Sequence, residues 1–331
     1  MTQLETRYRD TVNRLAFSML IFEGLSLLFG VLLSIVPLFT AALTARTADI
    51  VFEIANGLGY AATFLLPAFF FRLISRSKPV EPMYMERKLP RETLLYIFMG
   101  IAIVTAAAYA NAFIVELFDY SAFSEEVLWQ QDVSANYQIV LMLFTTAVVP
   151  AFVEEFLFRG LVLSNLLPYG RTTAILASAL LFGMMHQNVE QLLYTTVAGL
   201  VLGYLYVKTR SIWVCVMLHF VNNFISVLQT VLLERLSEMA ANTAIAVMYS
   251  VILTVGLISM ILLLLREPDR RGEILKTGVF ERELPADPDY VVEEIPLKRR
   301  VRLFFSIPMV VFFVLCAIQM GALILLALFA F

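Results

Sequence analysis

The chain has 331 residues, of which 60% are hydrophobic and 15% are charged, and its mean hydropathy is +0.82. Soluble domains carry about 25% charged residues, so this composition excludes an ordinary water-soluble protein. The net charge of −3 says little because the charges are unevenly placed, and Cys215 and Cys316 form neither a disulfide framework nor a CxxC metal or redox motif.

Several apolar runs of about 20 residues or more predict an all-α protein, a polytopic transmembrane helical bundle. The first apolar run is too long for the h-region of a cleavable signal peptide. The spans at 171–186 and 189–207 are short. We expect about nine spans, near residues 15–43, 49–74, 92–116, 137–161, 171–186, 189–207, 211–233, 240–265 and 303–330.

Lysine and arginine are distributed unevenly between the two sides of this bundle. Three precede the first span, six lie at 72–91 and nine at 266–302, whereas the opposite side has only Arg46 and Arg235. Because cytoplasmic loops carry the excess of basic residues, we expect a cytoplasmic N-terminus and an external C-terminus.

The chain divides into five parts by composition and motif content. We expect the polar segment 266–302, with its four prolines and mixed charge, to be a cytoplasmic linker whose basic end, LKRRVR, binds anionic lipid. A gate or a partner-docking segment is the alternative. The other parts are helices 1–3 with their loops at 1–136, a core at 137–233 that holds the motifs described next, an eighth helix at 234–265 and a C-terminal helix at 303–331.

The apolar run at 137–161 contains three charged residues within the stretch PAFVEEFLFR. Charged side chains inside a bilayer cost at least a few kcal/mol each and are usually paired. Glu155 and Arg159 are four residues apart, so they share a helix face and can form an ion pair. Glu154 lies about 100° further around the helix and is free to point elsewhere, and Pro150 favours a kink one turn before it.

The only two histidines lie in the apolar segments that follow. His186 comes four residues after Phe182, and His219 comes four residues before Asn223, so each pair shares a helix face. Asn222 is adjacent but points about 100° away. We expect these side chains and the glutamates to converge on one polar site inside the membrane.

Such a set of side chains suits the hydrolysis of a peptide bond by activated water. A carboxylate and an imidazole can take a proton from water and deliver it to a leaving amine, while a second imidazole and an amide can hydrogen-bond an oxyanion. No serine or cysteine lies beside these residues in a nucleophile motif. A glutamate and two histidines could also hold Zn²⁺, but the HExxH motif of the common zincins is absent, so zinc is the less favoured alternative to a site with no cofactor.

Each motif also has a purely structural interpretation. The glutamate–arginine pair alone is typical of a structural ion pair, and the histidine–asparagine pair of an interhelical hydrogen bond. Glu23 and Glu53 have no partners in the sequence, and we expect them to be structural, cavity-lining or near the interface. The combination favours a function, because every histidine of the chain falls within these short motifs.

Three motifs occur in order on successive apolar segments: EExxxR (Glu154 to Arg159), FxxxH (Phe182 to His186) and HxxxN (His219 to Asn223). Together they resemble the CPBP (Abi, CAAX-protease-like) family of intramembrane glutamic proteases. The resemblance covers about residues 137–233. Any single motif is unspecific, but the ordered trio is specific.

The resemblance implies a role for each of these residues. Glu154 would be the general base that activates water, with His186 assisting it, and His219 and Asn223 would form the oxyanion hole. No metal would be required. The supporting residues would be Glu155, Arg159 and Phe182.

The expected depth of His186 conflicts with such a site. His186 closes the span 171–186, nominally on the outer side, whereas Glu154 lies toward the cytoplasmic half of its helix. Either the two short spans form a hairpin that does not fully cross, or the fifth span begins later. Irregular backbone at depth is allowed where it lines a cavity.

We therefore predict an intramembrane endopeptidase that cleaves a membrane-associated peptide or protein near the membrane surface. The alternative is a non-catalytic membrane scaffold or immunity protein with the same fold; a transporter is disfavoured because no inverted repeat is visible. We expect a multi-pass protein of a prokaryotic plasma membrane, embedded in the lipid bilayer, with no nucleic-acid partner and with 266–302 as the segment that could bind another protein.

Overall fold

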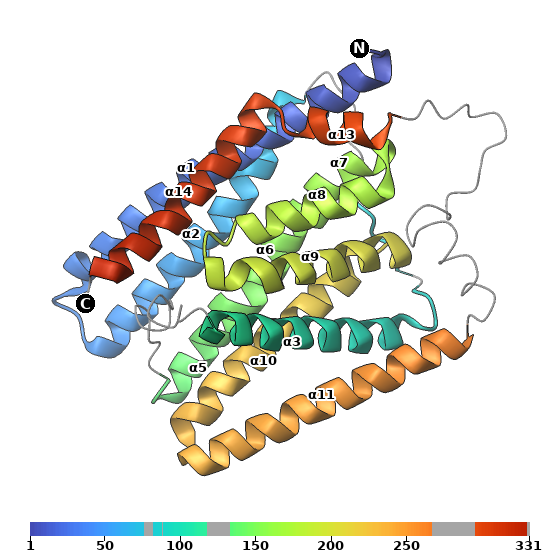
Figure 1. Cartoon of the computed structure of the whole chain (residues 1–331). Helices are drawn as coiled ribbons and strands as arrows, with labels where there is room; N and C mark the ends of the chain where they lie inside the picture. The colour runs from blue at the N-terminus through green and yellow to red at the C-terminus, as the bar shows by residue number, and fades with distance from the viewer. Residues whose placement is uncertain (76–81, 88, 118–132, 267–294, 330–331) are drawn as a thin grey trace.

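The computed structural model describes residues 1–75, 82–87, 89–117, 133–266 and 295–329, and within these ranges the chain is helical, with one isolated β-bridge (Figure 1). The predicted all-α class is confirmed. The longer helices are α1 (Gln3–Thr40), α2 (Ala45–Ile74), α3 (Thr93–Leu117), α9 (Val189–Thr209), α10 (Ile212–Arg235), α11 (Glu238–Arg266) and α14 (Ile307–Phe329).

Seven helical segments of the described chain are long and apolar enough to cross a membrane, and there are eight if the bent pair of α13 (Leu297–Phe304) and α14 forms one span. The predicted count of about nine is compatible with this set once the shorter α8 (Arg171–Met184) is added. However, α8 has 14 residues and rises about 21 Å, less than the roughly 30 Å of the hydrocarbon core. The fifth expected span therefore does not cross by itself.

The N-terminal helix begins earlier than its apolar sequence predicts. The Thr2 hydroxyl accepts a hydrogen bond from the Glu5 backbone N–H, and the Glu5 carboxylate accepts one from the Thr2 N–H. This capping box satisfies two amide groups that a helix start would leave free. The polar residues before Leu15 therefore continue the first membrane helix instead of forming a separate tail.

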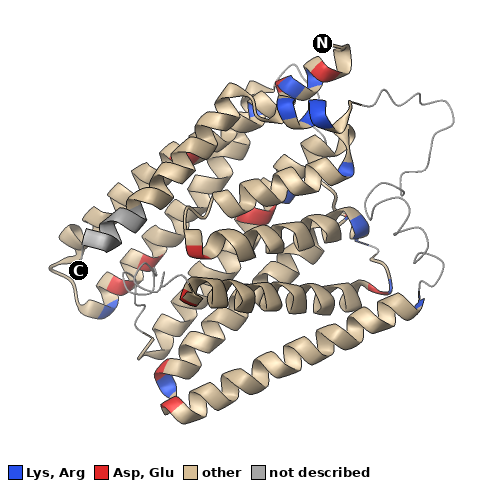
Figure 2. Cartoon of the chain, in the orientation of Figure 1, with Lys and Arg blue, Asp and Glu red and all other residues tan. Residues whose placement is uncertain are grey.

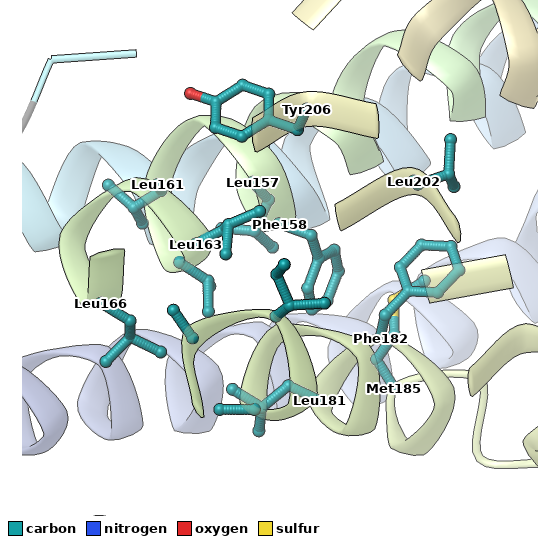
Figure 3. Packing of buried hydrophobic residues seen from close by; sticks show 14 of the residues in the cluster. Leu157, Phe158, Leu161, Leu163, Leu166, Leu181, Phe182, Met185, Leu202 and Tyr206 are labelled. Carbon is teal, nitrogen blue, oxygen red and sulfur yellow. The ribbon is translucent and has the colours of Figure 1, made fainter. Parts of the chain in front are cut away.

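Three helix pairs pack closely: α1 with α2, α8 with α9, and α3 with α11. Figure 1 shows α14 running alongside α1 and α11 at the opposite edge of the bundle. Apolar side chains of the segment after the glutamates pack against α8 and α9 (Figure 3). This core lies on one side of the predicted site. The members labelled in Figure 3 include Leu157, Phe158, Leu181, Leu202 and Tyr206.

Lysine and arginine gather around the start of α1 and along α13 (Figure 2). Arg299 of α13 pairs with Glu5 at 2.9 Å, and Arg300 donates a hydrogen bond to the Tyr169 carbonyl at 2.8 Å. Part of the basic segment LKRRVR therefore binds the protein itself, which modifies the expectation that it serves as a lipid anchor. The rest of the expected linker, 267–294, lies outside the described residues.

Candidate active site

The helix that carries the two glutamates is irregular on both sides of them. It passes from α5 (Asn136–Met142) through a π-helical turn, η2 (Leu143–Val148), into α6 (Val149–Glu155), and then through a second π-helical segment, η3 (Phe156–Leu163). π-Helical turns are rare and often lie at functional sites. The sequence predicted a single kink at Pro150, whereas the structure places Pro150 in the first turn of α6, between the two π segments.

Glu155 is the centre of a fully buried network behind the site. Its Oε1 accepts hydrogen bonds from Arg159 Nη1 at 3.0 Å and from His219 Nδ1 at 2.8 Å. Arg159 Nη2 also donates to the Gly199 carbonyl at 3.1 Å, and its guanidinium lies 4.5 Å from the ring centroid of Phe182. The predicted ion pair between Glu155 and Arg159 is therefore confirmed, and it links α6, η3, α9 and α10.

Glu154 faces the other way and lies at the pocket. The hydroxyl of Tyr60, on α2, donates to Glu154 Oε1 at 2.5 Å. Glu154 Oε2 lies 3.9 Å from His219 Nε2 and hydrogen-bonds to none of the described side chains or backbone groups. One carboxylate oxygen is thus fixed by a phenol, and the other is buried without a hydrogen-bond partner among the described residues.

His186 lies on the turn between α8 and α9. Its Nδ1 lies 2.8 Å from the Phe182 carbonyl oxygen, and because a carbonyl can only accept, the Nδ1–H donates and the lone pair is on Nε2. Its ring stands edge-on to Phe182 at 5.1 Å. The turn between α8 and α9 brings His186 to the same pocket as Glu154, and the 14 residues of α8 are too few to cross the bilayer alone.

Asn223 hydrogen-bonds to the irregular helix at a backbone carbonyl to which Pro150 cannot donate. Its Nδ2 donates to the Thr146 carbonyl at 3.0 Å, and that carbonyl lies four residues before Pro150, which has no N–H to offer it. Asn222 donates to Asn223 Oδ1 at 3.2 Å. The asparagine amide therefore has one N–H engaged, and a second N–H remains for another acceptor.

These side chains surround one pocket of about 430 Å³. The four residues predicted to be catalytic all line it, whereas Glu155 and Arg159 lie behind the lining. Asn222, expected to point away, lines it too. The principal polar members of the lining are Asn56, Tyr60, Glu154, His186, Gln191, Tyr194, His219, Asn222 and Asn223.

Tyr60 is the contact that sequence reasoning missed. It lies 94 residues from Glu154, so no local spacing connects the two. A weak signal exists, because Asn56 and Tyr60 are four residues apart and mark a polar face on an otherwise apolar helix. Within the described ranges, no three His, Cys, Asp or Glu side chains are arranged to hold a metal ion.

Comparison with known proteins gives a match over the stretch that carries the three motifs. The family model of type II CAAX prenyl endopeptidase Rce1-like proteins matches residues 136–225, which include all three motifs. The protein named "Putative membrane peptidase YdiL" from Bacillus subtilis (strain 168) is 26% identical over 182 residues, which cover 53% of this chain and 72% of that protein. Together these matches support assignment of the chain to the CPBP family. No solved structure matches it significantly.

The two matches support an intramembrane protease in general and agree with the multi-pass architecture. The match to the Rce1-like family model ends within α10, two residues after Asn223. The parts of the chain before 136 and after 225, including the α2 residue Tyr60, are outside that match.

Proposed function

We propose that this chain is an intramembrane endopeptidase that hydrolyses a peptide bond with water activated by Glu154. The observation that carries the proposal is the pair of environments at the two glutamates. Glu154 lines the pocket and its Oε2 has no protein hydrogen bond, whereas Glu155 lies behind the lining with its Oε1 bonded to Arg159 and His219. A general base needs a free lone pair within reach of its proton donor, and Glu154 has one.

In this mechanism Glu154 Oε2 removes a proton from water as the water oxygen attacks the substrate carbonyl carbon. Tyr60 fixes the other carboxylate oxygen, and His186 Nε2, which lines the same pocket, orients the water. The tetrahedral intermediate then collapses, the C–N bond breaks, and Glu154 returns its proton to the leaving amine. The products are a carboxylic acid and an amine, with no covalent enzyme intermediate.

The oxyanion is stabilised by His219 and Asn223. The Nδ1–H of His219 is engaged with Glu155, so Nε2 can donate to an oxyanion only when the ring is protonated. The second N–H of Asn223 supplies the other donor.

The substrate is a membrane-associated peptide or protein, because the pocket lies among membrane-spanning helices. The matched family model is described by its action on prenylated CAAX proteins and the bacterial relative as a membrane peptidase. These descriptions favour a substrate cut close to the bilayer surface, in the cell membrane of a prokaryote.

Comparison of protein termini tests the proposal. Membranes from cells that express wild type or Glu154→Gln at equal, verified levels would be labelled at free N-termini and analysed by mass spectrometry. We expect new termini with wild type alone, and these termini also supply the cleavage sequence. Identical termini with two folded proteins would reject hydrolysis and leave a scaffold or immunity role for the fold.

A further inference from the structure

Glu23 is a buried acid in α1 that the mechanism above does not use. Its side chain is 2% exposed, although it lies near the middle of a membrane-spanning helix. Ionisable groups at such depth are costly and usually serve a function through a partner. The sequence offered no partner for it, because none lies within a few residues on the same helix.

The structure supplies that partner from a distant part of the chain. Gln187 Nε2 donates to Glu23 Oε2 at 2.6 Å, across 164 residues. The carboxylate therefore joins α1 to the turn between α8 and α9.

This turn is the one that presents His186. Gln187 follows His186 directly and has a φ of 54°, a left-handed conformation that is unfavourable for a residue with a side chain. The turn continues into α9, where the Asn188 side chain caps the helix by accepting from the Glu190 N–H at 2.8 Å. A strained backbone conformation persists only when its surroundings hold it, and the hydrogen bond to Glu23 is a tether at this point.

The ring of His186 needs two restraints to face the pocket. The bond from Nδ1–H to the Phe182 carbonyl fixes the ring relative to the last turn of α8. It does not fix the turn relative to the rest of the bundle, where α1 and α14 lie. The Glu23–Gln187 bond provides such a restraint from α1, beside the bond from Asn111 of α3 to the Glu190 carbonyl in the first turn of α9.

We propose that Glu23 is a positioning residue that holds the His186 turn in place through its hydrogen bond to Gln187. This role rests on the proposed function, because it matters for cleavage only if His186 orients the water. Glu23 itself lines no part of the pocket and takes no proton from the substrate.

Four variants and one control test this role. Glu23→Leu keeps the size of the side chain and removes the acceptor, and a leucine is well tolerated in a membrane helix. Glu23→Gln keeps an acceptor oxygen. Gln187→Glu places two carboxyl groups together, and adding Glu23→Gln to it exchanges donor and acceptor so that the bond can form again. The control is Glu53→Leu, which removes another intramembrane glutamate, on α2, that does not line the pocket.

The decisive readout is the imidazole of His186, observed by NMR in detergent. The chain has only two histidines, so histidine-selective ¹⁵N labelling with a histidine-free affinity tag gives two ring systems, which His219→Gln assigns. We expect a single Nδ1–H tautomer for His186 in wild type, Glu23→Gln and the exchanged pair. In Glu23→Leu and Gln187→Glu we expect the His186 signals to shift and broaden while those of His219 stay in place.

Cleavage is the second readout, at the site found by the comparison of termini. We expect Glu23→Leu and Gln187→Glu to lower the rate by about 10-fold to 100-fold, the usual effect of a small misplacement near the chemistry. The exchanged pair should recover most of the rate, and Glu53→Leu should match wild type. A purely structural role would lower the amount of folded protein without moving the His186 signals alone.

Unchanged His186 signals in Glu23→Leu would overturn the proposal, as would equal disturbance of both histidines. The NMR result does not depend on catalysis, so it separates the two proposals. If wild type generates no new termini, the protease function fails while the NMR experiment still decides whether Glu23 holds the turn.

Discussion

At the scale of single residues, Glu154 and Glu155 have the same side chain and very different surroundings. Glu155 is fully enclosed and pairs with Arg159 and His219, and a buried charge that loses its partner costs about 3–5 kcal/mol. Glu154 has one phenol as its hydrogen-bond partner and an oxygen at the pocket. Stability therefore constrains Glu155, whereas the proposed chemistry constrains Glu154 and the groups that orient it.

Tyr60→Phe tests the contact that orients Glu154. The change removes one hydroxyl and keeps the ring, and a hydrogen bond to a charged group is worth about 1.5–3 kcal/mol, so we expect cleavage to slow by roughly 10-fold or more. The rate is measured on the substrate identified from the new termini, alongside unfolding in detergent. Tyr109→Phe, on α3 and away from the pocket, is the matched control. A wild-type rate for Tyr60→Phe would show that the phenol does not matter.

Contacts within one helix were predictable at this scale, and contacts between distant helices were not. The spacing of Glu155 and Arg159 predicts their pairing, because residues four apart meet on a helix surface. The approach of Tyr60 to Glu154 depends on how α2 packs against α6. The spacing of residues within one helix does not determine the angle at which two helices pack. For the same reason, the hydrogen bond between Gln187 and Glu23 could not be predicted from the sequence.

At the scale of elements, the segment from 136 to 169 differs most from its predicted form. Apolar length predicts one regular span, and the proline predicts one kink. The structure instead has two π-helical segments, one before α6 and one after it. Whether a helical turn takes the π form depends on which carbonyls find partners elsewhere, such as Thr146 with Asn223, and that partner lies 77 residues away.

Pro150→Ala tests the link between this irregular helix and Asn223. The new N–H can bond to the Thr146 carbonyl, which then competes with Asn223 for it. We expect unchanged or higher resistance to unfolding, because alanine favours helix, together with a several-fold loss of cleavage as the Asn223 amide loses its anchor. Pro37→Ala, in the exposed part of α1, should leave cleavage unaltered. A Pro150→Ala variant with full activity would argue against Asn223 as an anchored oxyanion donor.

At the scale of the whole molecule, α13, in the C-terminal part of the chain, contacts both the start of α1 and the turn before α8. Arg299 pairs with Glu5 near the N-terminus, and Arg300 bonds to the Tyr169 carbonyl. Next to that carbonyl is Gly170, whose φ of 130° is strained for any residue with a Cβ atom. A methyl group there would also meet the Arg300 guanidinium.

Gly170→Ala should therefore destabilise the whole bundle at this junction. We expect a loss of about 1–3 kcal/mol from the strained backbone, seen as a lower midpoint of unfolding in detergent. Gly30→Ala is the matched control, because its Cβ atom meets open space within a regular helix, and we expect it to be neutral or slightly stabilising. Equal midpoints for the two variants would mean that the junction contributes little to stability.

The shortness of α8 has a consequence for which bonds the protein can cut. A helix that began at one surface of a roughly 30 Å hydrocarbon layer and rose about 21 Å along its normal would end about 9 Å short of the other surface, and His186 follows the end of α8 by two residues. The pocket would then lie at a fixed depth in the bilayer. Which peptide bond of a substrate reaches it would depend on the distance between that bond and the point where the substrate leaves the bilayer. Moving that bond along a substrate by a few residues should abolish cleavage even when the sequence around it is unchanged.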